Sequence, residues 1–173
     1  MDLLEAFRSI KTFVFDVDGV LTDGFLTISD DGQMVRRMNI KDGYALQLAV
    51  KQGYGIVIIT GGNSESVKER LIRLGIQNVF LKVEDKKAKL IEYLEANNIS
   101  SKEVLFMGDD IPDYFAMQSA GLACAPADAA AEIKNISHYI SPVKGGYGCA
   151  RDVIEKVLKL NHHWPMDTTI SSK

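Results

Sequence analysis

Short apolar runs alternate along the chain with longer segments in which apolar residues recur at helical spacing. The short runs predict β-strands, because uninterrupted apolar runs of this length are typical of strands buried on both faces. The expected strands cover residues 11–15, 55–60, 79–81, 104–107, 122–125 and 139–140, and the expected helices cover 42–52, 64–74, 85–97, 112–119, 129–135 and 149–160. This alternation predicts an α/β fold of the Rossmann-like type, with a parallel sheet and helices on both faces.

The chain of 173 residues is long enough for one domain, which we place at residues 1–160 with a C-terminal tail at 161–173. Trp164 is expected to dock that tail on the domain surface. A net charge of −3 without a basic patch argues against a nucleic-acid partner. No apolar stretch approaches the length of a membrane span, so a cytoplasmic protein without a membrane partner is expected.

Residues 25–37 interrupt the alternation with two β-prone runs on either side of Asp30-Asp31-Gly32. Such a turn between apolar runs predicts a β-hairpin. Its residues Leu26, Ile28, Met34 and Val35 are more apolar than a solvated hairpin requires, and two strands alone are marginal. We therefore expect the hairpin to pair with other subunits; an edge hairpin folded on its own domain is the alternative.

Polar side chains follow four of the predicted strands. Asp16 and Asp18 follow the first strand, and because they lie two residues apart they can face one site. Thr60-Gly61 offers a hydroxyl and backbone amides for phosphate oxygens at the next strand end, and Lys86 follows the third. Residues 108–113, Gly-Asp-Asp-Ile-Pro-Asp, follow the fourth. The carboxyl ends of parallel strands share one edge of a sheet, so these groups are expected to converge.

This order of groups resembles the signatures of the haloacid dehalogenase superfamily, which are D-x-D-x-[TV], a Thr or Ser, a Lys, and a G-D-D-x-x-D-type acidic motif. The resemblance spans nearly the whole chain. It implies a phosphomonoester hydrolase in which Asp16 attacks phosphorus and Asp18 serves as general acid and base. Thr60, Gly61 and Lys86 would hold the phosphoryl oxygens, and the cofactor Mg²⁺ would bind Asp16, the Asp18 main-chain carbonyl and Asp109. For Asp113 two roles stay open: it orients Lys86 or the metal waters, or it caps the following helix.

Only 41 residues separate Asp18 from Thr60, which leaves no room for the helical cap of many relatives. The capless architecture, the run at 16–24 and the hairpin resemble the 3-deoxy-D-manno-octulosonate 8-phosphate phosphatases of lipopolysaccharide sugar biosynthesis. That resemblance implies a homotetramer joined through the 25–37 hairpin and a small phosphorylated sugar acid as substrate. It also implies substrate contacts from Asp18, Asn39, Lys41, Asp42, Gly43, Gln47 and Arg70.

Position 62 departs from this family, which commonly has an arginine after the Thr-Gly pair where this chain has Gly62. The related phosphatases of nine-carbon keto-sugar-acid 9-phosphates also differ there, so they remain the alternative substrate class. Other classes fit less well. A receiver-type signalling domain would lack a second carboxylate two residues after the nucleophile, a phosphomutase would carry a cap, and a non-catalytic accessory domain would not need an intact set of acids and lysine.

Overall fold

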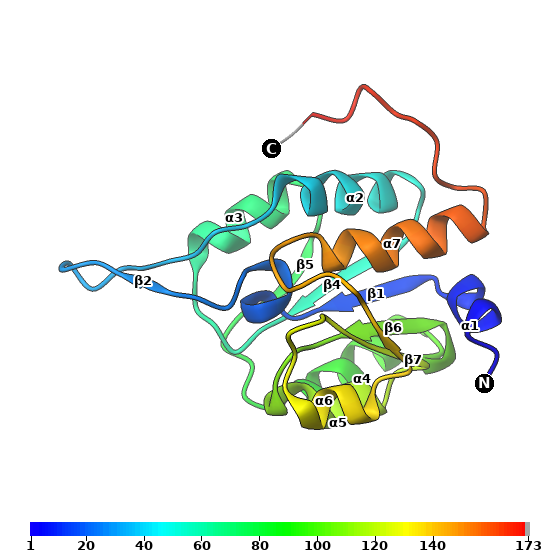
Figure 1. Ribbon diagram of the computed structural model, residues 1–173, viewed down its shortest axis with the longest axis horizontal. Helices are drawn as coiled ribbons and strands as arrows, with labels where there is room; N and C mark the ends of the chain where they lie inside the picture. Colours follow the sequence, from blue (N-terminus) through cyan, green and yellow to red (C-terminus); the bar gives the residue numbers. More distant parts are fainter. Residues whose placement is uncertain (172–173) are drawn as a thin grey trace.

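A parallel sheet of six strands forms the centre of the computed structural model, which describes residues 1–171 (Figure 1). The strand order is β5-β4-β1-β6-β7-β8, and every neighbouring pair is parallel. The strands of this sheet are β1 (Thr12–Phe15), β4 (Gly55–Ile59), β5 (Asn78–Phe80), β6 (Val104–Met107), β7 (Leu122–Ala125) and β8 (Tyr139–Ile140). The expected Rossmann-like α/β fold is confirmed.

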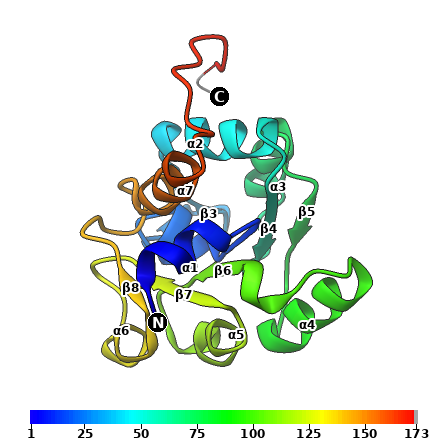
Figure 2. The same cartoon turned by 90° about the vertical axis from the view of Figure 1, so that its right-hand side faces the viewer.

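Helices cover both faces of the sheet (Figures 1 and 2). One face carries α2 (Ile40–Lys51), α3 (Glu65–Arg73) and α7 (Cys149–Leu160), with α1 (Leu3–Ser9) packed beside α7. The other face carries α4 (Lys86–Ala96), α5 (Tyr114–Gln118) and α6 (Ala131–Ile136). Two apolar clusters fill the space between the sheet and these layers.

Alternation along the strands explains why they are apolar throughout. In β1, Phe13 and Phe15 point into the cluster under α2 and α7, whereas Val14 points into the cluster under α4 and α5. In β6, Leu105 and Phe106 divide between the two clusters in the same way. Successive side chains of a strand face opposite sides, so a strand covered on both sides has no position that favours a polar residue.

The structure differs from the sequence expectations in three local features. The N-terminal helix α1 was not predicted; Asp2 caps it by accepting a hydrogen bond from the amide of Leu4, and its Phe7 is buried. The expected helix at 112–119 is divided into a 3₁₀ turn, Ile111–Asp113, and α5, because Asp110 and Asp113 close a capping box around that turn. The hairpin forms, but β2 (Thr27–Ile28) and β3 (Met34–Val35) are shorter than the expected runs.

The hairpin projects away from the body beyond the carboxyl ends of the strands (Figure 1). Within residues 1–171 its two strands pair only with each other, and an isolated bridge between Thr22 and Met38 closes its base. Between Asp18 and Thr60 the described chain forms the rest of the short turn Val17–Leu21, this hairpin, α2 and β4, and no further helix or strand. The expected absence of a cap is therefore confirmed for the described residues.

The C-terminal segment follows α7 and lies against α2 (Figure 1). Trp164 packs edge-on against Tyr44 of α2, with ring centroids 6.0 Å apart, and the Tyr44 hydroxyl donates to the backbone carbonyl of Asp167. The last two positions of the expected tail, 172–173, lie outside the described residues. None of the helices in residues 1–171 combines the length and the apolar character that a membrane crossing requires.

Candidate active site

Asp16 and Asp18 lie in the turn that follows β1, as expected. The amide of Asp16 continues the sheet by donating to the carbonyl of Met107 in β6, which places the residue between two strand ends. Gly19 has a φ of +85°, and a β-carbon at this position would overlap the carboxylate of Asp109. Glycine is therefore required, both for the left-handed backbone and for the approach of the acidic turn.

Gly145 and Gly146 pack against this turn. The carbonyl of Gly19 lies so near Gly145 that no side chain fits at position 145, and the amide of Gly146 donates to the carbonyl of Val20. Thr22 is fully buried, and its Oγ1 accepts hydrogen bonds from the amides of Gly19 and Gly24. The nucleophile turn is thus held by contacts on both sides.

Lys86 links the nucleophile turn to the acidic turn. It is the first residue of α4, it is 5% exposed, and its Nζ lies 3.0 Å from Asp16 Oδ1 and 2.7 Å from Asp113 Oδ1. Burial by itself would lower the pKa of Lys86, but the charges of Asp16 and Asp113 outweigh it and the pKa is raised. The lysine therefore stays charged in the site.

Asp113 orients Lys86, one of the roles left open from the sequence, but it makes no side-chain cap on the following helix α5; it closes the 3₁₀ turn Ile111–Asp113 instead. It is fully buried; its Oδ1 accepts from Lys86, and its Oδ2 accepts from the backbone amides of Asp109 and Asp110 at 3.0 and 3.4 Å. Both carboxylate oxygens are therefore engaged, one in orienting the lysine and the other in capping the acidic turn.

Thr60 and the residues after it form the remaining wall. Thr60 directly follows β4 and is 3% exposed, and its Oγ1 accepts a hydrogen bond from the amide of Gly62 at 3.1 Å. An open cavity of ≈ 460 Å³ is lined by the residues of these turns, namely Asp16, Asp18, Gly24, Thr60, Gly61, Gly62, Val83, Glu84, Lys86, Asp109, Asp110, Pro112 and Asp113. The groups expected at the four strand ends, namely the Asp16/Asp18 pair, Thr60-Gly61, Lys86 and the acidic turn at 108–113, therefore converge around one cavity.

The carboxylates at the base of the cavity fit a divalent cation. Oxygens of Asp16, Asp109 and Asp113 lie within 4.8 Å of one another. Burial and the nearby charge of Asp113 raise the pKa of Asp16 to about 7, and Lys86 limits the rise. Burial, followed by the charges of Asp16 and Asp113, raises the pKa of Asp109 to about 8. Because the oxygens of Asp113 are already bonded, Asp16 and Asp109 are the better ligands, and a hard cation would relieve their repulsion.

Removal of divalent cations is expected to make folding stability depend on pH. The pKa values of Asp16 and Asp109 are 3.8 in the unfolded chain and are raised by burial to about 7 and about 8 in the folded one, so between these values the folded state binds more protons. Stability in EDTA should therefore fall as pH rises from about 4 to about 8. Saturating Mg²⁺ should reduce this fall, because it binds the deprotonated carboxylates. Melting temperatures across this range test the effect; Asp109→Asn should show a shallower fall in EDTA, and identical profiles with and without Mg²⁺ would contradict it.

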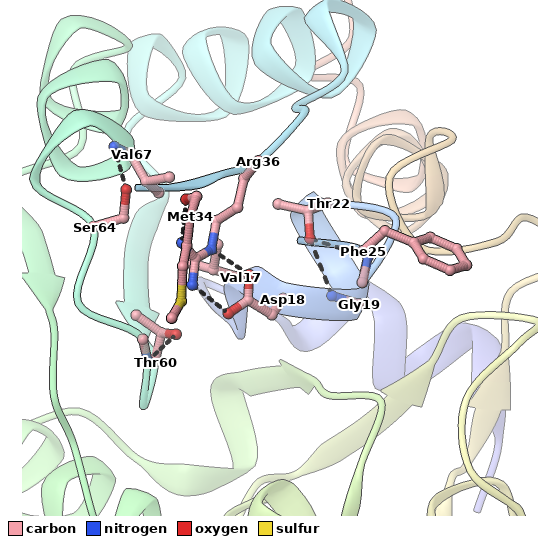
Figure 3. Close-up of polar contacts among 12 residues, drawn as sticks. Val17, Asp18, Gly19, Thr22, Phe25, Met34, Arg36, Thr60, Ser64 and Val67 are labelled. Atoms are coloured by element: carbon pink, nitrogen blue, oxygen red, sulfur yellow. Dashed lines mark hydrogen bonds and ion pairs between the residues drawn. The ribbon is translucent and has the colours of Figure 1, made fainter. Parts of the chain in front are cut away.

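Arg36 is a site residue that sequence reasoning missed. It follows β3, and its Nε donates to Asp18 Oδ1 at 2.6 Å while its Nη2 donates to Asp18 Oδ2 at 3.1 Å (Figure 3). The only signal in the sequence is a pair of arginines at the end of the hairpin, Arg36 and Arg37. Arg37 instead points outward and pairs with Asp23, with its side chain 79% exposed.

Asp18 lines the cavity, whereas the structure places the other expected substrate contacts outside the cavity wall. Asn39 caps α2 and donates to the carbonyl of Gly146; Lys41 is exposed. Asp42 is buried, accepts from the amide of Arg151, and has its pKa raised to about 6 by burial. These side chains and Gly43 form the start of α2.

Gln47 and Arg70 also lie outside the lining of the cavity. Gln47 donates to the carbonyl of Ser171. Arg70 lines a hollow of ≈ 330 Å³ between α3 and the hairpin, together with Arg36, and is the expected contact best placed to meet a ligand that extends from the cavity.

Comparison with known proteins identifies the family. A family model described as haloacid dehalogenase-like hydrolase matches residues 79–151. The 3-deoxy-D-manno-octulosonate 8-phosphate phosphatase KdsC of Escherichia coli (strain K12) is 31% identical over 157 residues, which cover 91% of this chain and 84% of that protein. The chain belongs to the KdsC family of haloacid dehalogenase-like phosphatases.

Solved structures of the KdsC family share the fold. The 3-deoxy-D-manno-octulosonate 8-phosphate phosphatase from Yersinia pestis superposes with a TM-score of 0.91 at 29% identity, covering 94% of this chain and 88% of that one. The corresponding enzyme from Moraxella catarrhalis, in complex with a magnesium ion, a phosphate ion and a KDO molecule, gives 0.88 at 31% identity, covering 91% and 90%. The expected superfamily, the capless family and the phosphatase class are thereby confirmed.

Proposed function

We propose that this enzyme is a Mg²⁺-dependent phosphatase that releases inorganic phosphate from 3-deoxy-D-manno-octulosonate 8-phosphate, a step in lipopolysaccharide sugar biosynthesis. The observation that carries the chemistry is the ion-pair chain from Asp16 through Lys86 to Asp113, with Asp18 at the same cavity. Membership of the KdsC family and the KDO-bound relative support the choice of substrate.

The residues divide the reaction into two half-reactions. Asp16 attacks phosphorus; Lys86 and the amide of Val17 both bind its Oδ1, so we assign the attack to Oδ2. The bond from phosphorus to the ester oxygen breaks, and Asp18 protonates the leaving oxygen. Asp18 then removes a proton from water, whose oxygen attacks the phosphorus of the aspartyl-phosphate and restores the Asp16 carboxylate.

Charge stabilisation comes from groups fixed before the substrate arrives. Lys86 would contact a phosphoryl oxygen while Asp113 keeps it in place, and Thr60 with the amide of Gly61 would bind the others. Mg²⁺ on Asp16, Asp109 and the Asp18 carbonyl would supply further neutralisation of phosphoryl charge. A receiver-type domain would accumulate the phosphoaspartate, whereas Asp18 provides the acid and base that remove it.

Arg70 is the proposed contact for the substrate carboxylate. Among the described residues its Nε and Nη2 are buried and lack a hydrogen-bond partner, and burial lowers the pKa of Arg70. Buried donors are normally satisfied, so an anionic ligand in the neighbouring hollow would complete this group. Asn39, Lys41, Asp42, Gly43 and Gln47 are retained as proposed contributors to the sugar-acid site at the start of α2.

A phosphate-release screen tests the substrate assignment. Eight- and nine-carbon keto-sugar-acid phosphates, hexose phosphates and p-nitrophenyl phosphate would be compared in the presence of Mg²⁺. The eight-carbon ester should show the highest kcat/KM, and Arg70→Gln should raise its KM about 10-fold or more while leaving p-nitrophenyl phosphate nearly unchanged. Arg73→Gln, an exposed arginine on the same helix, is the control. A preference for the nine-carbon ester would replace the assignment by its alternative, which Gly62 keeps open.

We also propose a homotetramer assembled through the hairpin. Phe25 and Ile28 are 78% and 71% exposed, and Met34 and Val35 of the opposite strand are exposed as well. Contiguous apolar residues on a projecting element are typical of an interaction surface.

We propose further that the enzyme works in the cytoplasm. A charged phosphate ester does not cross membranes unaided, so the enzyme would act in the compartment where the ester is made; cell fractionation tests this.

The Ile28→Asp, Met34→Lys variant should shift the enzyme to dimers or monomers, because charges would be buried in the proposed interface. Light scattering after size exclusion measures the change. Leu4→Asp, an equally polar substitution at an exposed apolar position of α1, should leave the assembly intact. Deletion of residues 25–37 gives a second test, and an unchanged tetramer in both variants would refute the role of the hairpin.

A further inference from the structure

Arg36 reaches from the hairpin into the catalytic turn. Its side chain is 9% exposed, whereas Met34 and Val35 of β3, directly before it, are exposed. Besides its two hydrogen bonds to Asp18, it donates through Nη1 to the carbonyl of Met34 at 3.1 Å. The guanidinium is thus oriented by contacts at three of its nitrogens, and Figure 3 shows it directed at Asp18 from above the turn.

Gly62 makes room for this arginine. A β-carbon at position 62 would lie 3.2 Å from Asp18 Oδ2, 3.3 Å from Arg36 Nη2 and 3.3 Å from Thr60 Oγ1. The position of that β-carbon is therefore surrounded by Asp18, the proposed general acid, by Thr60, the proposed phosphoryl ligand, and by the guanidinium of Arg36. A longer side chain at position 62 would compete with Arg36 for the same space, so the loop glycine and the hairpin arginine form a matched pair.

Arg36 has more N–H groups than its contacts with Asp18 and Met34 use. A guanidinium has five N–H groups, and the contacts described use three of them, one on each nitrogen. Nη2, which has a second hydrogen, lies 3.3 Å from the point that a β-carbon of residue 62 would occupy, and Gly62 lines the phosphoryl cavity. Arg36 can therefore donate a hydrogen bond to an anionic oxygen without releasing Asp18.

Charge balance favours such a contact. The cavity is lined by five aspartates and one glutamate, with Lys86 as its one lysine among the described lining residues. A phosphate ester adds further negative charge beside Asp18, where Lys86 is committed to Asp16 and Asp113. A second cation at the Asp18 side would reduce that repulsion.

We propose that Arg36 is a phosphoryl-binding residue supplied by the hairpin, and that it replaces, from a different part of the chain, the cationic side chain that position 62 lacks. The guanidinium bridges Asp18 and a phosphoryl oxygen of the bound ester. This inference rests on the proposed phosphatase chemistry, but it does not depend on which sugar acid is the substrate.

Inorganic phosphate is the probe that tests this role, because it carries the phosphoryl oxygens without a leaving group. Arg36→Gln should raise both the inhibition constant of phosphate and the KM of p-nitrophenyl phosphate about 10-fold, and Arg36→Lys should retain part of the affinity. Arg37→Gln is the matched control, since it removes a neighbouring hairpin charge that pairs with Asp23 outside the cavity. This control should leave both constants within about twofold of the wild type.

A relocation variant separates phosphate binding from an effect on folding or on Asp18 alone. Arg36→Ala should lose phosphate affinity, and the double variant Arg36→Ala, Gly62→Arg should regain much of it, because position 62 faces the same space. An unchanged inhibition constant in Arg36→Gln overturns the proposal, and so does a fall in kcat with no change in phosphate affinity. If the wild type rejects the eight-carbon ester but Arg36→Gln still weakens phosphate binding, the substrate assignment fails and the role of Arg36 stands.

Discussion

Asp16→Asn is expected to reduce phosphate release at least about 1,000-fold, because the amide cannot form the aspartyl-phosphate. The fold should persist. Burial raises the pKa of Asp16 to about 7, so its ionised form is disfavoured in the folded protein, and a neutral amide removes one of several crowded negative charges. The melting temperature in EDTA at pH 8 should therefore not fall, even though activity is lost.

Asp30→Asn is the control for this experiment, since it makes the same chemical change at an exposed position in the hairpin turn. It should keep wild-type turnover. Substantial turnover by folded Asp16→Asn, measured over a range of enzyme concentrations to exclude a contaminant, would remove Asp16 as the nucleophile.

Asp18→Asn is expected to lower kcat about 100- to 10,000-fold on a sugar phosphate, because the leaving alkoxide is no longer protonated. p-Nitrophenyl phosphate has a leaving group that needs no proton, so its first half-reaction should be spared. Water would still lack its base, and phosphoenzyme should accumulate. A burst of one p-nitrophenol per active site followed by slow turnover is the expected signature.

The burst distinguishes two roles of Asp18. If Asp18 only anchors the hairpin through Arg36, Asp18→Asn should impair both leaving groups equally and give no burst. The control is Asp23→Asn, which breaks the other arginine pair at the hairpin base and should leave the kinetics of both half-reactions unchanged.

Much of the fold could be predicted because its determinants are local. The apolar runs that became β6, β7 and β8 have the observed bounds, since burial on both faces leaves a continuous signal in the sequence. The site followed from topology: once the strands are parallel, the residues after them must share an edge. Asp16, Thr60 and Lys86 were therefore placed together correctly without any knowledge of distances.

Contacts that depend on the path of an irregular segment could not be predicted. The pairing of Arg36 with Asp18 depends on how a two-strand hairpin tilts over the sheet, and no periodicity encodes that tilt. The dual role of Asp113 required the position of its two oxygens. The helix α1 was missed because a capping aspartate and a single buried phenylalanine give a weak signal.

The hairpin carries an exposed apolar strand pair and, at its base, the arginine that holds Asp18. If other subunits cover that strand pair, subunit association and phosphate binding act on the same structural element and become thermodynamically linked. Phosphate would then tighten the assembly by the same factor by which assembly tightens phosphate. Dilution of the enzyme would raise its apparent KM, so the specific activity of this phosphatase would depend on its own concentration.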